Sequence, residues 1–198
     1  MKMQLSSTYT FENFKQELRE RLEEWTLRNL DSDGLRRSAV KILLMEKNGQ
    51  PHVLLTKRTE KVSTHKGQIS FPGGGYDETD DSILDTAYRE TFEEVGIPEE
   101  NIDFIGQFDD YVSIFGHHVS CFIGSVPYPV EYRFSRDEID DYIEAPLKLF
   151  ADLKYDRIET YNHEGKDVAV YYYYFEGYEI WGLTARILTD FARKVLKN

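Results

Sequence analysis

Hydrophobic residues recur along the chain with two different spacings. Over residues 10–29 they recur every three or four positions, which predicts an amphipathic helix with Phe14 and Leu18 on its apolar face. The same spacing predicts helices over residues 82–95 and 184–197. Shorter runs rich in branched and aromatic residues predict strands. The expected strands cover residues 38–45, 52–56, 102–108, 119–126, 157–161 and 168–175, the last two as a hairpin.

Residues that break regular structure lie between these segments. The sequence Lys-Asn-Gly at residues 47–49 predicts a turn, and the glycine-rich run at residues 71–75 predicts irregular backbone. Either Asp80 or Asp81 is expected to cap the start of the following helix, and Gly96 is expected to end it.

The C-terminal part of the chain mixes both kinds of pattern. Residues 135–150 predict a mostly helical segment on either side of Pro146. The four consecutive tyrosines at residues 171–174 predict an alternating strand with two rings inward, and Trp181 is expected in the core. Strands and helices mixed in this way predict a compact α/β or α+β sandwich.

Composition fits one main domain and limits its partners. We expect residues 1–34 to form an N-terminal helical appendage packed on or near a domain that covers residues 35–198. The formal charge of −12 argues against nucleic-acid binding, and no apolar run reaches the roughly 20 residues of a membrane span. The first residues lack the layout of a signal peptide. Because Cys121 is the only cysteine, an internal disulfide is excluded and a cytoplasmic location is expected.

Charge is unevenly distributed in the first half of the chain. One short stretch is basic and contains Lys57, Arg58, Lys61, His65 and Lys66. The next is acidic and contains Asp77, Glu78, Asp80, Asp81 and Asp85. Such a pair is expected where a polyanion is held through metal ions, although two solvated surface loops would show the same charges.

Three glutamates lie close together on the helix at residues 82–95. At about 100° per residue, Glu90, Glu93 and Glu94 fall within one arc beside the apolar face. That apolar face is expected to contain Leu84, Ala87, Tyr88, Phe92 and Val95. Like charges at this spacing destabilise a helix unless they are neutralised, and carboxylate oxygens suit Mg²⁺ or Mn²⁺. The alternative is a solvated acidic helix end.

The sequence context of these glutamates carries a family resemblance. The pattern Gly75-x5-Asp81-x7-Arg89-Glu90-Thr91-x-Glu93-Glu94-x-Gly96-Ile97 resembles the signature box of the Nudix hydrolases. It departs from the box at Asp81, where the family has Glu, and at Thr91, where an aliphatic residue is usual. The resemblance implies an α/β/α sandwich with a mixed central sheet and metal-dependent hydrolysis of a pyrophosphate bond.

The same resemblance implies the roles of the box residues. Glu90 and Glu94 are the expected metal ligands, joined by Glu93 and the backbone carbonyl of Gly74, with Mg²⁺ or Mn²⁺ as the cofactor. Arg89 is expected to orient the glutamates through charge-assisted hydrogen bonds. The general base stays open between a box glutamate and a residue on a later segment. Glu138 and Glu144 are the outside candidates, and each is alternatively an ordinary surface acid.

Residues before the box resemble the coenzyme A pyrophosphatase subfamily. The motif covers residues 54–59 and 67–74, with further similarity at residues 105–111, 145–147 and 180–188. The implied reaction cleaves coenzyme A or acyl-coenzyme A to a 4′-phosphopantetheine and adenosine 3′,5′-bisphosphate. Substrate phosphates are then expected at two cations, Arg58 and Lys66, and at two glycines that allow close backbone approach, Gly67 and Gly73.

One residue departs from the subfamily pattern and keeps other substrates open. Ser63 stands where Arg or Lys is usual, so Lys61 or Lys66 would have to substitute. The alternative substrates are an ADP-sugar, NADH or a dinucleotide polyphosphate. A Nudix-fold binding protein without catalysis is a third hypothesis, against which the clustered glutamates argue. The expected partners are a small-molecule nucleotide and, because the family often dimerises, a second copy of the chain. His117 and His118 are interpreted as a strand entrance rather than as metal ligands.

Overall fold

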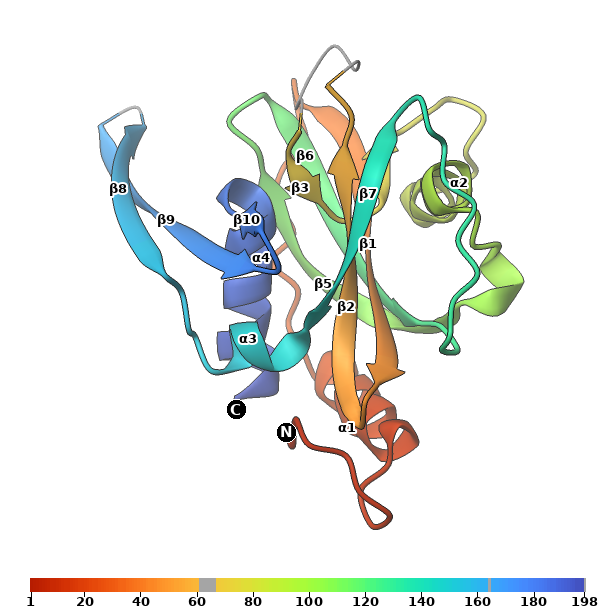
Figure 1. The fold of residues 1–198 in the computed structure, drawn as a ribbon. Helices are drawn as coiled ribbons and strands as arrows, with labels where there is room; N and C mark the ends of the chain where they lie inside the picture. The colour runs from red at the N-terminus through yellow and green to blue at the C-terminus, as the bar shows by residue number, and fades with distance from the viewer. Residues whose placement is uncertain (61–66, 164, 198) are drawn as a thin grey trace.

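The computed structural model describes residues 1–60, 67–163 and 165–197. In these ranges a mixed seven-stranded sheet stands beside a smaller three-stranded sheet (Figure 1). The large sheet has the order β3-β2-β1-β6-β5, with β4 paired to β1 and β7 paired to β2. Its strands are β1 (Arg36–Lys47), β2 (Gln50–Arg58), β3 (Ile69–Ser70), β4 (Gly73–Gly75), β5 (Asp103–Val112), β6 (His117–Ser125) and β7 (Ile139–Pro146).

Helices cover both faces of the large sheet. They are α1 (Phe11–Glu23), α2 (Ile83–Val95), α3 (Leu147–Ala151) and α4 (Gly182–Phe191), with short turns η1 (Glu99–Asn101) and η2 (Ala192–Leu196). Alternate residues of β1 face opposite layers, because strand side chains alternate. Leu43 and Met45 pack with α2, whereas Ile42 and Leu44 join the core formed with α1 and α4. The expected α/β/α sandwich with a mixed sheet is confirmed.

The smaller sheet consists of β8 (Arg157–His163), β9 (Lys166–Phe175) and β10 (Tyr178–Ile180). Its β8–β9 hairpin extends away from the large sheet, and α4 follows it in the chain (Figure 1). Among the consecutive tyrosines, Tyr171 and Tyr173 pack against the main core while Tyr174 is exposed on the other face. The predicted hairpin with two inward rings is therefore confirmed.

Two strands replace predicted irregular or helical segments. The expectation of irregular backbone over residues 71–75 is wrong, because Gly73–Gly75 pairs antiparallel with β1. This pairing requires glycine, since a Cβ at Gly73 would collide with the Ala39 carbonyl. The helix expected before Pro146 is also wrong. Ile139 and Ile143 are buried on one side of β7, which pairs with β2 along most of its length.

Smaller corrections concern the ends of helices. The first helix was expected to continue to Asn29, but α1 ends at Glu23. The following segment is held by Asp109, which accepts hydrogen bonds from the Trp25 indole and the Arg28 amide. Ser82, rather than Asp80 or Asp81, caps α2, and Gly96 ends it as expected with φ of 73°. In the described ranges, we find no helix with the length and apolarity to cross a membrane.

Candidate active site

Helix α2 turns one carboxylate inward and leaves its neighbours nearer to solvent. Glu94 is 2% exposed, Glu90 is half-buried and Glu93 is exposed. Phe92, expected in the core, is instead 56% exposed, because the buried face is rotated towards Thr91 and Glu94. Thr91 fits at the position where the box has an aliphatic residue, since its hydroxyl donates to the Ala87 carbonyl at 2.6 Å.

The Glu94 carboxylate accepts hydrogen bonds from residues of two strands, β2 and β4. Arg58, the last residue of β2, donates from Nη1 to Glu94 Oε1 at 3.0 Å. The Gly73 amide of β4 donates to Oε2 at 3.2 Å. Burial nevertheless raises the pKa of Glu94 to about 8, because desolvation outweighs these contacts. A second cation close to Glu94 would offset this desolvation and favour the ionised carboxylate.

The glycine strand β4 lies directly against the second carboxylate. A Cβ on Gly74 would collide with the Glu90 carboxylate group, so only glycine leaves room for that side chain. Burial also raises the pKa of Glu90, partly offset by Arg89. The backbone of Gly73 and Gly74 and the carboxylates of Glu90 and Glu94 therefore converge on one place between β4 and α2.

Arg89 forms hydrogen bonds with several polar groups between β4 and α2. Its Nη1 donates to Glu90 Oε1 at 2.9 Å and to Glu93 Oε2 at 3.2 Å, and its Nη2 donates to the Gly75 carbonyl at 2.9 Å. This geometry suits the orienting role expected for Arg89.

Sequence reasoning missed Asp80 as a member of the site. Arg89 Nε and Nη2 donate to the two oxygens of this carboxylate at 2.8 and 3.0 Å, and Thr86 donates to it at 2.8 Å. The hydrogen bonds from Arg89 hold the pKa of Asp80 far below its usual range. Asp81, which occupies the box position, is exposed. The two adjacent aspartates were the available signal, but only the fold shows which of them turns inward.

The structure separates the two outside candidates for the general base. Glu138 Oε2 lies 3.4 Å from Arg58 Nη2, so Arg58 lies between Glu94 and Glu138. Glu144 is instead paired with Lys47 at 2.7 Å and accepts a hydrogen bond from Tyr132 at 2.8 Å. Glu138 is thus beside the site, whereas Glu144 is held in a separate ion pair.

The expected substrate-binding residues are only partly within the described ranges. Arg58 and Gly73 lie in the site, and the Arg58 Nε is buried with no hydrogen-bond partner among the described residues. Gly67 has φ of 64°, a conformation that favours glycine, and a Cβ there would collide with Glu60. Lys66, Ser63 and Lys61 lie outside the described residues.

The oxygen donors of this site fit a hard cation, and in this structure two of the carboxylates form ion pairs with arginines. Within the ranges described, no group of three or more His, Cys, Asp or Glu side chains is arranged to hold a metal ion. Glu90 and Glu94 instead contact Arg89 and Arg58. Two half-buried or buried carboxylates beside the Gly74 backbone are nevertheless the oxygen donors that Mg²⁺ and Mn²⁺ prefer.

Two other expectations concern residues outside this place. His117 begins β6, with Nδ1 2.8 Å from the Ser38 hydroxyl, and His118 Nε2 lies 3.1 Å from the Leu30 carbonyl. The strand-entrance interpretation is confirmed. The expectation that Trp181 is core is wrong, because its side chain is 42% exposed at the start of α4.

Comparison with known proteins decides the family. The model of the NUDIX domain matches residues 35–161. This chain belongs to the Nudix family. It is 34% identical over 160 residues to an uncharacterised Nudix hydrolase, NudL, of Escherichia coli (strain SMS-3-5 / SECEC), covering 80% of this chain and 83% of the relative. NudL of Shigella boydii serotype 4 (strain Sb227) is 35% identical over the same shares. These relatives support a Nudix hydrolase that cleaves pyrophosphate bonds.

Two solved structures match this chain at lower sequence identity. A MutT/nudix family protein from Enterococcus faecalis is 18% identical with a TM-score of 0.49, covering 98% of this chain and 76% of that chain. A C. elegans Ap4A hydrolase is also 18% identical with a TM-score of 0.49, covering 58% of this chain and 82% of that chain.

Proposed function

We propose that this Nudix hydrolase cleaves coenzyme A or acyl-coenzyme A to a 4′-phosphopantetheine and adenosine 3′,5′-bisphosphate. The observation that carries the proposal is the meeting of Arg58 and Gly73 at Glu94. Both residues come from segments that resemble the coenzyme A pyrophosphatases. The contact of both segments with Glu94, a glutamate of the box, supports the proposal.

In the proposed reaction, protein side chains hold the cofactor and the substrate in place. Glu90, Glu94, Glu93 and the Gly74 carbonyl would hold Mg²⁺ or Mn²⁺, which when bound polarises phosphoryl oxygens and lowers the pKa of water. Arg89 keeps Glu90 and Glu93 oriented through the contacts described above. The Arg58 guanidinium, which also contacts Glu94, would give the substrate phosphate a cationic donor.

Glu138 is our candidate for the general base. It lies beside Arg58, which also contacts Glu94, and this position next to an expected metal ligand supports the assignment. The substitution Glu138→Gln is expected to lower kcat about 100-fold or more. The matched substitution Glu144→Gln should leave kcat within a few-fold, and equal effects in the two variants would exclude this assignment.

Ser63 supports a second candidate function. Ser63 stands where the coenzyme A pyrophosphatases usually have Arg or Lys, so this chain has one cationic side chain fewer for the additional 3′-phosphate of coenzyme A. An ADP-sugar, NADH or a dinucleotide polyphosphate has no such 3′-phosphate to bind. Comparing kcat/KM for these compounds with that for coenzyme A decides between the two candidates.

The deciding experiment is incubation of purified protein with coenzyme A and Mn²⁺ or Mg²⁺, with products separated by mass. Wild-type protein should release adenosine 3′,5′-bisphosphate, and Glu94→Gln should release about 1,000-fold less in the same time, because a metal ligand is lost. If wild-type protein cleaves an ADP-sugar but leaves coenzyme A intact, the substrate assignment is wrong while the hydrolase remains.

A further inference from the structure

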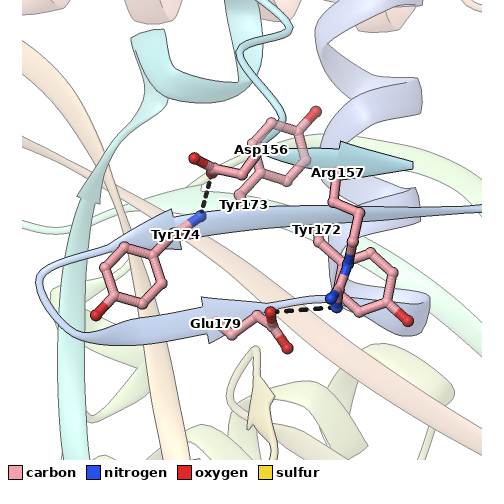
Figure 2. Close-up of a pocket in the computed structure, with 6 residues that line it drawn as sticks. All are labelled: Asp156, Arg157, Tyr172, Tyr173, Tyr174 and Glu179. Atoms are coloured by element: carbon pink, nitrogen blue, oxygen red, sulfur yellow. Dashed lines mark hydrogen bonds and ion pairs between the residues drawn. The ribbon is translucent and has the colours of Figure 1, made fainter. Parts of the chain in front are cut away.

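A pocket lies on the β8–β9–β10 sheet, formed by residues that the proposed reaction does not use. It has a volume of about 260 Å³ and is open to solvent. Figure 2 shows the residues that line it: Asp156, Arg157, Tyr172, Tyr173, Tyr174 and Glu179.

One edge of this pocket is a stack of flat groups. The Arg157 guanidinium lies over the Tyr172 ring, 3.9 Å from its centroid (Figure 2). On the same face of the β8–β9–β10 sheet, the Tyr172 and Trp181 rings are stacked, with centroids 6.0 Å apart and an angle of 9° between their planes. We call Arg157, Tyr172 and Trp181 the aromatic stack.

Strand register explains why the aromatic stack faces solvent. Arg157 is directly opposite Tyr172, and Ile180 is opposite Tyr173, so Trp181 continues on the face of Tyr172. Tyr173 and Ile180 are fully buried on the opposite face. A large indole that is 42% exposed beside a pocket offers a flat apolar surface to a ligand.

The charges around the aromatic stack select against a phosphate. Arg157 is paired with Glu159 at 3.2 Å and with Glu179 at 3.3 Å, so its charge is already neutralised. Asp156 and Glu179 line the pocket, and Glu159 adds a third carboxylate beside Arg157. Three carboxylates against one guanidinium repel an anion but accept hydrogen bonds from an amino group. A neutral aromatic ring that carries N–H donors fits this combination, and a nucleobase such as adenine is such a ring.

The aromatic stack is joined to the strands that carry the active site. Three residues after Trp181, the Thr184 hydroxyl donates to the Ile69 carbonyl at 3.0 Å. Ile69 lies in β3 and pairs with Lys57 of β2, the residue before Arg58. On the other side, the Tyr178 hydroxyl donates to Asp141 of β7, which also pairs with Lys57. The segment that carries Trp181 is therefore separated by one strand, β3, from the strand that ends at Arg58.

We propose that the exposed Trp181 ring of the aromatic stack binds the nucleobase of the substrate by stacking. The identification of the base as adenine rests on the proposed coenzyme A function, whereas the stacking site itself does not. In this arrangement Arg58, at the end of β2, contacts the phosphates of the nucleotide. Trp181, which directly follows β10, contacts its base.

The test compares two ligands that differ only by the base. AMP and ribose 5-phosphate are titrated by calorimetry into wild-type protein, Trp181→Leu and Tyr161→Leu, with Mg²⁺ present. Tyr161 is a matched control, because it is 59% exposed in the same sheet but lies outside the pocket. Base stacking predicts that wild type and Tyr161→Leu bind AMP roughly tenfold more tightly than ribose 5-phosphate. Trp181→Leu should lose most of this difference, and Trp181→Phe should restore part of it.

Two results would overturn the proposal. One is equal affinity of the wild type for AMP and ribose 5-phosphate. The other is a change of molar mass in Trp181→Leu by light scattering, which would make this face a contact between two copies of the chain. Because the titration needs no turnover, its result is independent of whether coenzyme A is the substrate. If coenzyme A is cleaved, Trp181→Leu should also raise KM while leaving kcat within a few-fold, a split that misfolding would not produce.

Discussion

Two ionisable side chains are buried against helix α2, and different groups surround each of them. Glu94 lies on α2 itself and meets the Arg58 guanidinium and the Gly73 amide. Lys41, from the centre of β1, is fully buried beside the same helix with no hydrogen-bond partner for its amine among the described residues. Its Nζ lies 3.3 Å from the centroid of the Tyr88 ring.

The two environments differ in the kind of group that surrounds the buried side chain. The polar network around Glu94 and Arg89 brings together groups from α2, β2 and β4, as a site for a charged ligand requires. Around Lys41 there are mainly aromatic rings, from Tyr88, Phe104 and Phe122. Cation–π contacts offset only part of the desolvation, and burial lowers the pKa of Lys41 to about 7.

The polar network around Glu94 and Arg89 should be disrupted most strongly by a substitution at Asp80. We expect Asp80→Asn to lower the free energy of unfolding by about 3 kcal/mol, because Arg89 loses the charge of the buried carboxylate that accepts two of its hydrogen bonds. The activity should also fall, since Arg89 then no longer holds Glu90 and Glu93 in place. Urea unfolding and kcat measure the two effects. Asp81→Asn is the control and should change stability by less than about 0.5 kcal/mol.

The pH dependence of this effect has a definite sign. The native pKa of Asp80 is depressed, so its contribution to stability is present above the ordinary carboxyl pKa of 3.8 and is lost as the pH falls below that value. The difference in stability between wild type and Asp80→Asn should therefore shrink in acid. A difference that stays constant down to pH 3 would contradict the assignment of Asp80 as an ionised partner of Arg89.

The contrast between Asp80 and Asp81 also shows how far sequence reasoning reaches. Helical spacing was sufficient to place Glu90 and Glu94 together, because their relative position depends only on α2. Alternation was sufficient for β1 and for the inward rings of β9. These predictions use contacts between residues close in sequence, which the local pattern contains.

Features that depend on distant segments were not predictable in this way. The strand character of Gly73–Gly75 depends on its close approach to Ala39, and glycine gives no apolar pattern that indicates pairing. The charged strand β7 resembles a helix until its pairing with β2 is known. The exposure of Trp181 depends on how β10 meets β9, which no local spacing indicates.

The substitution Lys41→Met tests the other buried ionisable group, the Lys41 amine. Methionine retains the length and apolar stem of lysine and removes the buried amine, so we expect a stabilisation of about 2 kcal/mol at pH 7. Asp85 and Glu99 favour the charged amine, although burial dominates. Urea unfolding at pH 7 measures the change, and Lys197→Met, an exposed lysine near the C-terminus, is the control.

The stabilisation should diminish as the pH rises. The native pKa of Lys41 is about 7 and its ordinary value is 10.5, so between these values the unfolded chain binds a proton that the native protein does not. Wild-type stability therefore gains from each rise in pH across this window, and the Lys41→Met variant lacks that gain. An advantage of Lys41→Met that does not change between pH 7 and pH 10 would show that the amine is charged in the native state.

The smallest effect is expected at Thr91, which lies on the buried face of α2 between the two kinds of environment. Its hydroxyl is fully buried, yet the Ala87 carbonyl one turn earlier accepts its hydrogen bond at 2.6 Å. Such a bond competes with the helical hydrogen bonding of the backbone and adds little to stability. Thr91→Val, which restores the aliphatic character usual for the box, should therefore change the unfolding free energy by less than about 1 kcal/mol and leave kcat unaltered. Because valine has nearly the same shape, thermal unfolding isolates the hydroxyl. A loss of 2 kcal/mol or more would mean that this hydroxyl, unlike the Lys41 amine, belongs to the polar network of the site.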